Sequence, residues 1–133
     1  IRLIFESSIQ PSYTYFSHLL YWLQRISGIG VLLFIIAHVW NTQLGPWLAG
    51  TWGTHFEHLS SGFADPESGI ITKSVYLLGV LGAVFHFANG LNTFSMTWGI
   101  ALTPKSQVRV RILSILLFII LSASALYALS AIW

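Results

Sequence analysis

The fold is decided by residues 19–40, which read LLYWLQRISGIGVLLFIIAHVW. The run is interrupted only by Gln24, Arg25 and Ser27 before His38 near its end. About 20 consecutive apolar residues are enough for an α-helix to cross the hydrocarbon core of a bilayer. The run therefore predicts a membrane-spanning helix over about residues 19–42.

The rest of the chain has the same character. Of its 133 residues, 55% are hydrophobic and 8% are charged, whereas an ordinary soluble domain carries about 25% charged residues. Two more apolar stretches predict helices over about 73–98 and 108–133, so we expect an all-α integral membrane bundle with three transmembrane helices. The outer connection is then 43–72 and the inner loop 99–107, and residues 1–8 resemble the tail of a preceding helix.

Several function classes are excluded by composition and motif. The absence of cysteine excludes disulfides, iron–sulfur ligation and covalent haem attachment through cysteine. A formal charge of +2 on few, dispersed charges does not suit nucleic acid, which requires a clustered basic face. The sequence shows no Ser-His-Asp set, no paired carboxylates in a span and no phosphate loop, so we expect no catalytic residue in this chain.

The cations predict the orientation. Arg25, Lys105, Arg109 and Arg111 flank one face of the expected bundle, and Lys73 stands alone at the other. Positive residues favour the cytoplasmic side. We therefore expect a multi-pass protein whose C-terminus lies outside the cytoplasm.

Two histidines, His38 and His86, fall within the predicted spans. Ionisable groups at membrane depth are costly and usually functional. His38 lies about one turn from the outer end of its helix, and His86 lies about 20 Å from the same face, which separates the two by about 14 Å in depth. They are too far apart to share one metal ion, but each could hold its own cofactor.

Glycines share the helical face of His86: Gly79, Gly82 and Gly90 stand seven and four residues before it and four after it. One interpretation is that they leave room for a flat macrocycle of haem size in the bundle core. The other is that they allow close helix packing, with His86 bonded to a neighbouring side chain. The residues alone favour neither.

Other polar residues are weaker candidates. Arg25 and Ser27 could bind carboxylates such as haem propionates, or a quinone head, although an interfacial arginine also explains the first. His55 and His58 could form half a zinc site, but no further ligand accompanies them and a solvated turn is favoured. His18 is expected at the interface.

Ordered motifs carry a resemblance to one family. They are Leu23-Gln24-Arg25-Ile26-Ser27-Gly28, His38-Val39-Trp40, Phe85-His86-Phe87-Ala88-Asn89-Gly90-Leu91, Thr97-Trp98-Gly99-Ile100 and Thr103-Pro104-Lys105-Ser106-Gln107. From about residue 3 onward the chain resembles the dihaem cytochrome b558 anchor of Bacillus-type succinate:menaquinone oxidoreductase, which is related to quinol:fumarate reductase anchors. The resemblance covers the last three helices of a five-helix, haem-binding bundle.

The resemblance implies two b haems, each held by two axial histidines from different halves of the anchor. His86 matches the ligand of the haem nearer the cytoplasm and His38 that of the outer haem. Gly82, Asn89 and Gly90 join them as candidate cofactor-binding residues. Missing N-terminal helices, or another chain, would supply the second ligands.

The resemblance also implies partners and a location. A flavoprotein subunit would oxidise succinate, an iron–sulfur subunit would pass electrons to this anchor, and menaquinone would accept them at the bacterial cytoplasmic membrane. The reverse direction would reduce fumarate. Some fumarate-reductase relatives carry a glutamate two residues before the inner ligand, and this chain has Val84 there, so a proton route at that position is not expected.

Two alternatives remain open. One is a three-helix, single-haem anchor that shares its site with a sister subunit, and the other is a haem-free structural or transport bundle whose histidines relay protons. The number of haems per complex separates all three.

Overall fold

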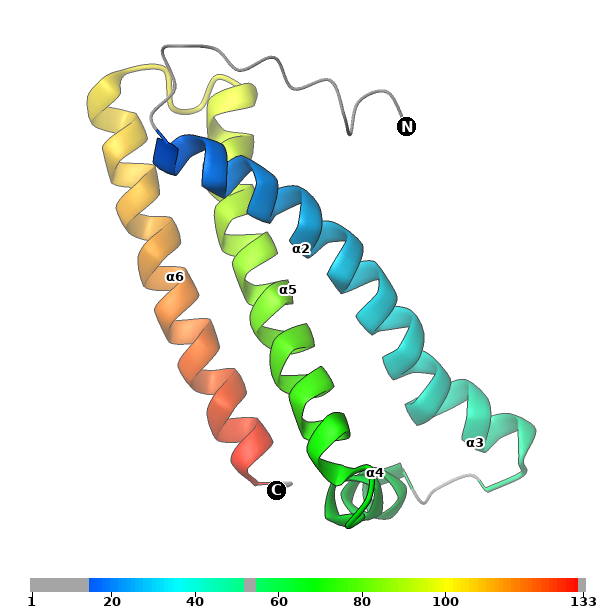
Figure 1. Cartoon of the computed structure of the whole chain (residues 1–133). Coiled ribbons are helices and arrows are strands. Elements are labelled where there is room, and N and C mark those ends of the chain that lie inside the picture. The colour runs from blue at the N-terminus through cyan, green and yellow to red at the C-terminus, as the bar shows by residue number, and fades with distance from the viewer. Residues whose placement is uncertain (1–14, 52–54, 132–133) are drawn as a thin grey trace.

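A computed structural model describes residues 15–51 and 55–131, without the side chains of 15–17 and 55–59. Three long helices dominate the described part (Figure 1). The elements in chain order are α2 (Tyr15–Val39), the π-helix η1 (Trp40–Leu44), α3 (Gly45–Leu48), α4 (His55–Ala64), α5 (Gly69–Thr97) and α6 (Pro104–Ser130). The expected helix tail over 1–8 lies outside the described residues.

Each long helix can cross a membrane. The three helices that are long and apolar enough are His18–Leu48, Gly69–Thr97 and Pro104–Ser130, of 31, 29 and 27 residues. At a rise of 1.5 Å per residue they are about 40–46 Å long, which exceeds the roughly 30 Å hydrocarbon core. The prediction of an all-helical bundle with three long apolar helices is confirmed.

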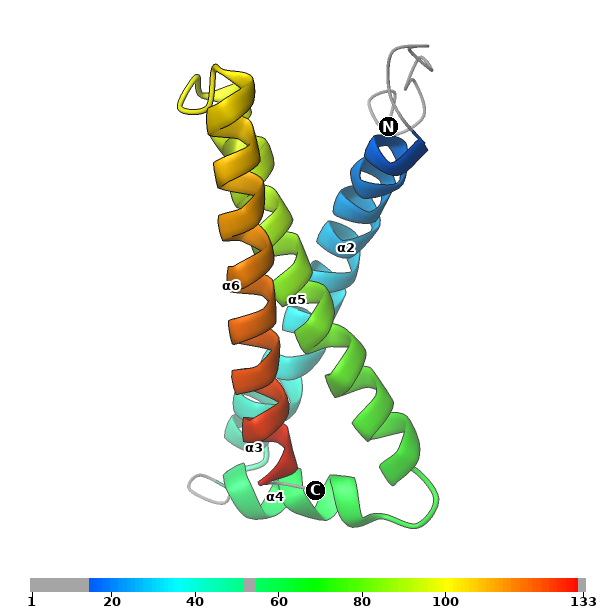
Figure 2. The ribbon, with the colours of Figure 1, turned by 90° about the vertical axis from the view of Figure 1, so that its left-hand side faces the viewer.

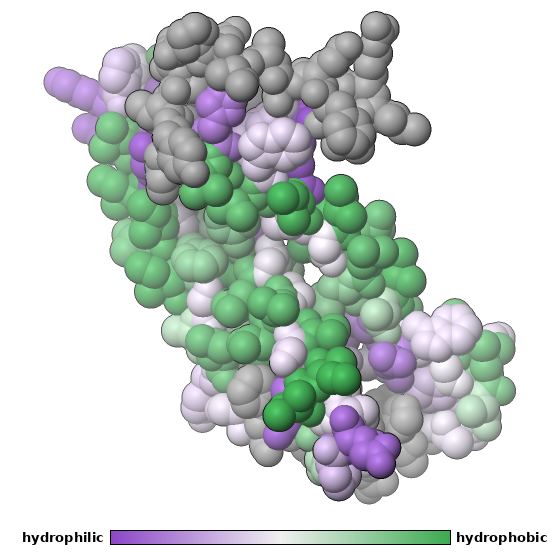
Figure 3. Space-filling model, viewed as in Figure 1, coloured by the Kyte–Doolittle hydropathy of each residue, from purple (hydrophilic) through white to green (hydrophobic). Residues whose placement is uncertain are grey.

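The helix α5 is the middle element, because it packs against both α2 and α6. Figure 2 shows that α6 runs alongside α5, whereas α2 crosses it at an angle, and that α4 lies across the end of the bundle near the C-terminus. On the face that Figure 3 shows, hydrophobic side chains fill the middle and most of the hydrophilic ones lie toward the two ends. This distribution is the one that a bilayer requires.

Most apolar side chains face outward: Leu32 and Ile36 on α2 are 59% and 58% exposed. The buried hydrophobic cluster lies instead at the α4 end of the bundle. It contains Phe63, Tyr76 and Leu129, with Phe34, Leu77 and Val80 packed against it. The short helix α4 therefore joins the three long helices at one end.

The helix α5 begins at Gly69 rather than at 73. The helix α6 begins before the predicted span of 108–133, at Pro104, where the sequence Thr103-Pro104 itself predicts a helix start. Local capping explains both differences. The Asp65 carboxylate accepts the N–H groups of residues 67 and 68 just before α5. Thr103 and Ser106 form a capping box, and Pro104 occupies the first turn of α6, where an N–H has no helical partner.

The first helix does not end at about residue 42, as predicted, but continues to Leu48 through the π turn. Proline lacks an N–H, so Pro46 cannot donate a hydrogen bond to the turn before it. The preceding Gly45 instead donates to the carbonyl oxygen of Trp40, five residues back. One widened turn thus accommodates the proline without ending the helix.

Candidate functional site

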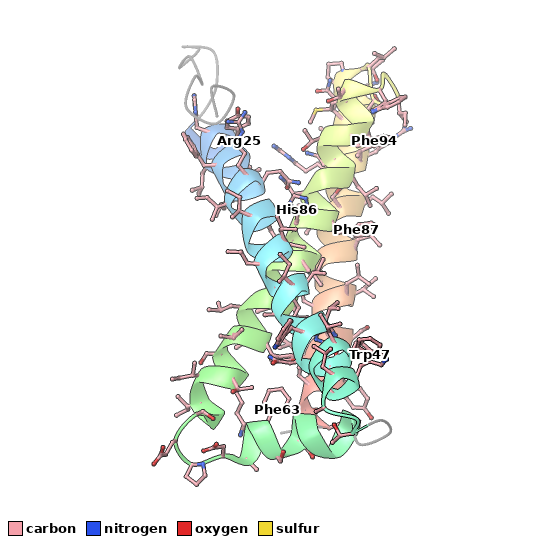
Figure 4. All side chains as sticks on the ribbon, turned by 90° about the vertical axis from the view of Figure 1, so that its right-hand side faces the viewer. Arg25, Trp47, Phe63, His86, Phe87 and Phe94 are labelled. Atoms are coloured by element: carbon pink, nitrogen blue, oxygen red, sulfur yellow. The ribbon has the colours of Figure 1, made fainter. Side chains whose placement is uncertain are left out.

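His86 lies where α2 and α5 come together, and its side chain lies between the two helices (Figure 4). Three groups of α2 surround its Nδ1: the carbonyl oxygen of Gln24 at 3.2 Å, Ser27 Oγ at 3.2 Å and Gln24 Nε2 at 3.3 Å. All belong to one helical turn, because residues three apart share a face of a helix. One edge of the imidazole is therefore fixed by α2.

Gln24 connects the two helices around His86. Its Nε2 donates to the carbonyl oxygen of His86 at 3.1 Å, and its Oε1 accepts from Asn89 Nδ2 at 2.8 Å. Ser27 Oγ donates to the carbonyl oxygen of Gln24 at 3.1 Å. We call these four residues, Gln24, Ser27, His86 and Asn89, the His86 network.

Glycines make the close approach of α2 and α5 possible. A Cβ on Gly28 would lie 3.0 Å from His86 Cε1, and one on Gly90 would lie 3.3 Å from Gln24 Nε2. A Cβ on Gly79 would overlap the ring of Phe34. A Cβ on Gly82, in contrast, would meet nothing within 4 Å. Gly79 and Gly90 thus serve helix packing, and Gly82 faces open space.

His38 lies in a different environment, among aromatic rings. It stacks on Phe34 with ring centroids 5.8 Å apart, and Tyr76 meets it edge-on at 5.8 Å. Phe63 of α4 also meets the tyrosine ring edge-on, with centroids 5.1 Å apart. Tyr76 is 8% exposed, and no described group bonds to its buried hydroxyl. The side chain of His38 itself is exposed.

The two histidines lie at different heights in the bundle. His86 contacts Ser27 and His38 contacts Tyr76. The distance from Ser27 to His38 along α2, and from Tyr76 to His86 along α5, is about 15 Å at 1.5 Å per residue. Two antiparallel helices thus give the same separation, so each imidazole can serve a separate centre.

The other candidates take separate positions. The guanidinium carbon of Arg25 lies 4.5 Å from the centroid of the Tyr21 ring. His18 belongs to α2, within its apolar run. The side chains of His55 and His58 lie outside the described ones. Within the described ranges no three His, Cys, Asp or Glu side chains gather as metal ligands.

A cavity of about 210 Å³ lies beside the His86 network, between α2, α5 and α6. Asn92 and Ser114 are its buried polar residues. The lining consists of Leu20, Phe85, Ala88, Asn89, Asn92, Arg111, Ser114, Ile115 and Phe118.

Sequence reasoning missed Gln24. The signal was present, since Gln24 and Ser27 form a polar pair three residues apart within an apolar span, and such pairs face a neighbouring helix. What the sequence lacked was the partner, because residues 24 and 86 are 62 positions apart.

Comparison with known proteins assigns the family. The family model described as succinate dehydrogenase/fumarate reductase transmembrane subunit matches residues 9–126 of the 133. The chain belongs to this family. One relative, the succinate dehydrogenase cytochrome b558 subunit of Bacillus subtilis (strain 168), is 34% identical over 119 residues, which cover 90% of this chain. The match covers 56% of that relative, so the chain spans about half of its length. No solved structure matches the transmembrane subunit described here.

Proposed function

We propose that the chain is the C-terminal part of a dihaem cytochrome b anchor that carries electrons from the iron–sulfur subunit of a succinate:quinone oxidoreductase to menaquinone. The observation that carries the proposal is the pair of imidazoles about 15 Å apart in depth within an apolar bundle. The family assignment and the name of the Bacillus subtilis relative support it.

The residues around His86 fit an axial haem ligand. Its Nδ1 is engaged by α2, whereas no hydrogen bond from the described residues reaches Nε2. Gly82, one turn earlier on α5, leaves the surface open beside the ring. Haem ligands commonly bond through one ring nitrogen while a neighbouring group fixes the other. His38, which contacts the rings of Phe34 and Tyr76, would hold the second haem.

A bound haem b supplies one-electron transfer at each histidine, and two axial imidazoles favour that chemistry over oxygen binding. The chain itself contributes ligands and an apolar barrier around them. The second axial ligands are proposed to come from other helices of the anchor or from another chain. Arg25 lies near the His86 network in sequence and is the candidate partner of a haem propionate.

The proposed setting is the bacterial cytoplasmic membrane, with the cationic end of the bundle and the flavoprotein and iron–sulfur subunits on the cytoplasmic side. The beginnings of α2 and α6 lie at the same end of the bundle (Figure 1). The first half of α2 contains Arg25 and the first half of α6 contains Lys105, Arg109 and Arg111, which supports this orientation. An electron that moves outward across the whole membrane gains about 2.3 kcal/mol per 100 mV. The gain helps the reduction of a low-potential quinone.

The test is the haem content of the purified complete complex and of two variants. We expect two reducible b haems in the native complex and one in each of the variants His86→Ala and His38→Ala. The haem that remains in one variant should differ in midpoint potential from the haem that remains in the other. One haem in the native complex would favour the single-haem anchor. A native complex without a reducible Soret and α band would contradict the proposal.

A further inference from the structure

We infer that Gln24 and Ser27 are positioning residues that hold the proton of His86 on Nδ1 and leave the Nε2 lone pair available to iron. The inference rests on the proposed function, because it gives Nε2 its role. The proposed histidine ligands alone do not imply it, because Gln24 and Ser27 are α2 residues of the His86 network that are not themselves proposed as ligands of iron.

The hydroxyl of Ser27 carries a single proton. The hydroxyl donates it to the carbonyl oxygen of Gln24 at 3.1 Å. The oxygen of Ser27 therefore meets His86 Nδ1, at 3.2 Å, with a lone pair. The carbonyl oxygen of Gln24, also at 3.2 Å, is a second acceptor. Two acceptors at one ring nitrogen favour a proton on that nitrogen.

Once the Ser27 proton is assigned, the amide of Gln24 is the remaining described donor near Nδ1. Asn89 Nδ2 donates to Gln24 Oε1 at 2.8 Å, which turns the amide nitrogen toward His86. That nitrogen carries two hydrogens. It donates one of them to the carbonyl oxygen of His86, at 3.1 Å against 3.3 Å for Nδ1. The amide thus bonds to the backbone of α5 and does not require an unprotonated Nδ1.

A neutral imidazole carries one N–H and one nitrogen with a free lone pair. With the proton on Nδ1, Nε2 is the ligating nitrogen. A hydrogen-bond acceptor bound to the N–H of the non-ligating ring nitrogen raises the basicity of a histidine ligand, and a more basic ligand stabilises ferric iron. Ser27 therefore lowers the midpoint potential of the haem on His86, and that of the other haem does not depend on it.

The experiment is a redox titration of the purified complete complex with Ser27→Ala. We expect the midpoint potential of one haem to become more positive while the other stays unchanged, and Ser27→Thr, which keeps the hydroxyl, to restore the native value. The matched control is Ser124→Ala, because that hydroxyl also donates to a carbonyl oxygen of its own helix, at 2.9 Å, and contacts no histidine.

Every outcome bears on the inference. Loss of one haem in Ser27→Ala, with full content in Ser27→Thr, would also support it, since such neighbouring bonds contribute about 10- to 100-fold in metal affinity. Unchanged potentials in Ser27→Ala, or equal haem loss in both variants, would overturn it. If the native complex contains haems, such a result would contradict the inference and leave the proposed function intact. A native complex without haem would contradict both.

Discussion

The two membrane histidines are placed by different forces. Hydrogen bonds with Gln24 and Ser27 hold His86 between α2 and α5, whereas His38 is held by contact with the rings of Phe34 and Tyr76. Hydrogen bonds fix direction, and aromatic packing fixes position with less directional demand. The removal of one polar atom is therefore expected to affect the His86 side, and a change of volume is expected to affect the His38 side.

The largest effect is expected from Gly79→Ala, which adds volume against Phe34. The new Cβ would overlap the Phe34 ring near its Cγ and Cδ2 atoms, so the ring or the helix must shift. Overpacking of this kind costs about 1–3 kcal/mol. We expect a lower thermal unfolding midpoint of the detergent-solubilised complex and an altered spectrum of the haem proposed at His38, whose ring stacks on Phe34.

Gly30→Ala is the matched control for Gly79→Ala. A Cβ at Gly30 meets nothing within 4 Å in the described structure, and alanine is favoured over glycine in a helix by about 1 kcal/mol. We expect no loss of stability. Equal losses in the two variants would show that the Phe34 contact does not decide the effect.

A smaller effect, of opposite sign, is expected from Tyr76→Phe. The buried hydroxyl of Tyr76 bonds to no described group, and an unsatisfied buried polar group costs about 1–3 kcal/mol. Its removal keeps the ring contacts, so we expect equal or slightly higher thermal stability and unchanged haem content. A clear loss of either would mean that the hydroxyl has a partner in the complete complex and that the His38 side also uses a hydrogen bond.

The smallest effect is expected from Asp65→Asn, at the turn before α5 on the His38 side of the bundle. Hydrogen bonds from the backbone N–H groups of Glu67 and Ser68 lower the pKa of Asp65. A lowered pKa in the folded state stabilises that state above the unfolded pKa of about 4, and the contribution disappears as the pH falls through the folded value. We expect the native complex to be slightly more stable than the variant at pH 7.

The same comparison at low pH completes the Asp65 test. The difference in thermal midpoint between native and Asp65→Asn complexes should shrink as the pH falls below about 4. A difference that stays constant with pH would show that the charge of the carboxylate does not contribute.

The sequence predicts the long helices well because their signal is local. Length and hydropathy identify three spans, and Thr103 with Pro104 is a typical helix start. The His86 network escaped prediction because it depends on the angle at which α2 crosses α5, which no local pattern contains. The role of Gly79 was ambiguous for the same reason, since only the facing Phe34 decides between packing and open space.

The π turn after His38 has a consequence for how relatives of this chain can differ in length. An i to i+5 bond holds one residue more than the i to i+4 bond of an ordinary turn, so Trp40–Leu44 contains one spare residue. Deletion of that residue would restore a regular helix and leave both His38 and the residues after the turn close to their present directions, because the widened turn absorbs the extra residue locally. A one-residue gap in an alignment here thus changes the length of the helix by one residue and leaves both sides of the turn in register.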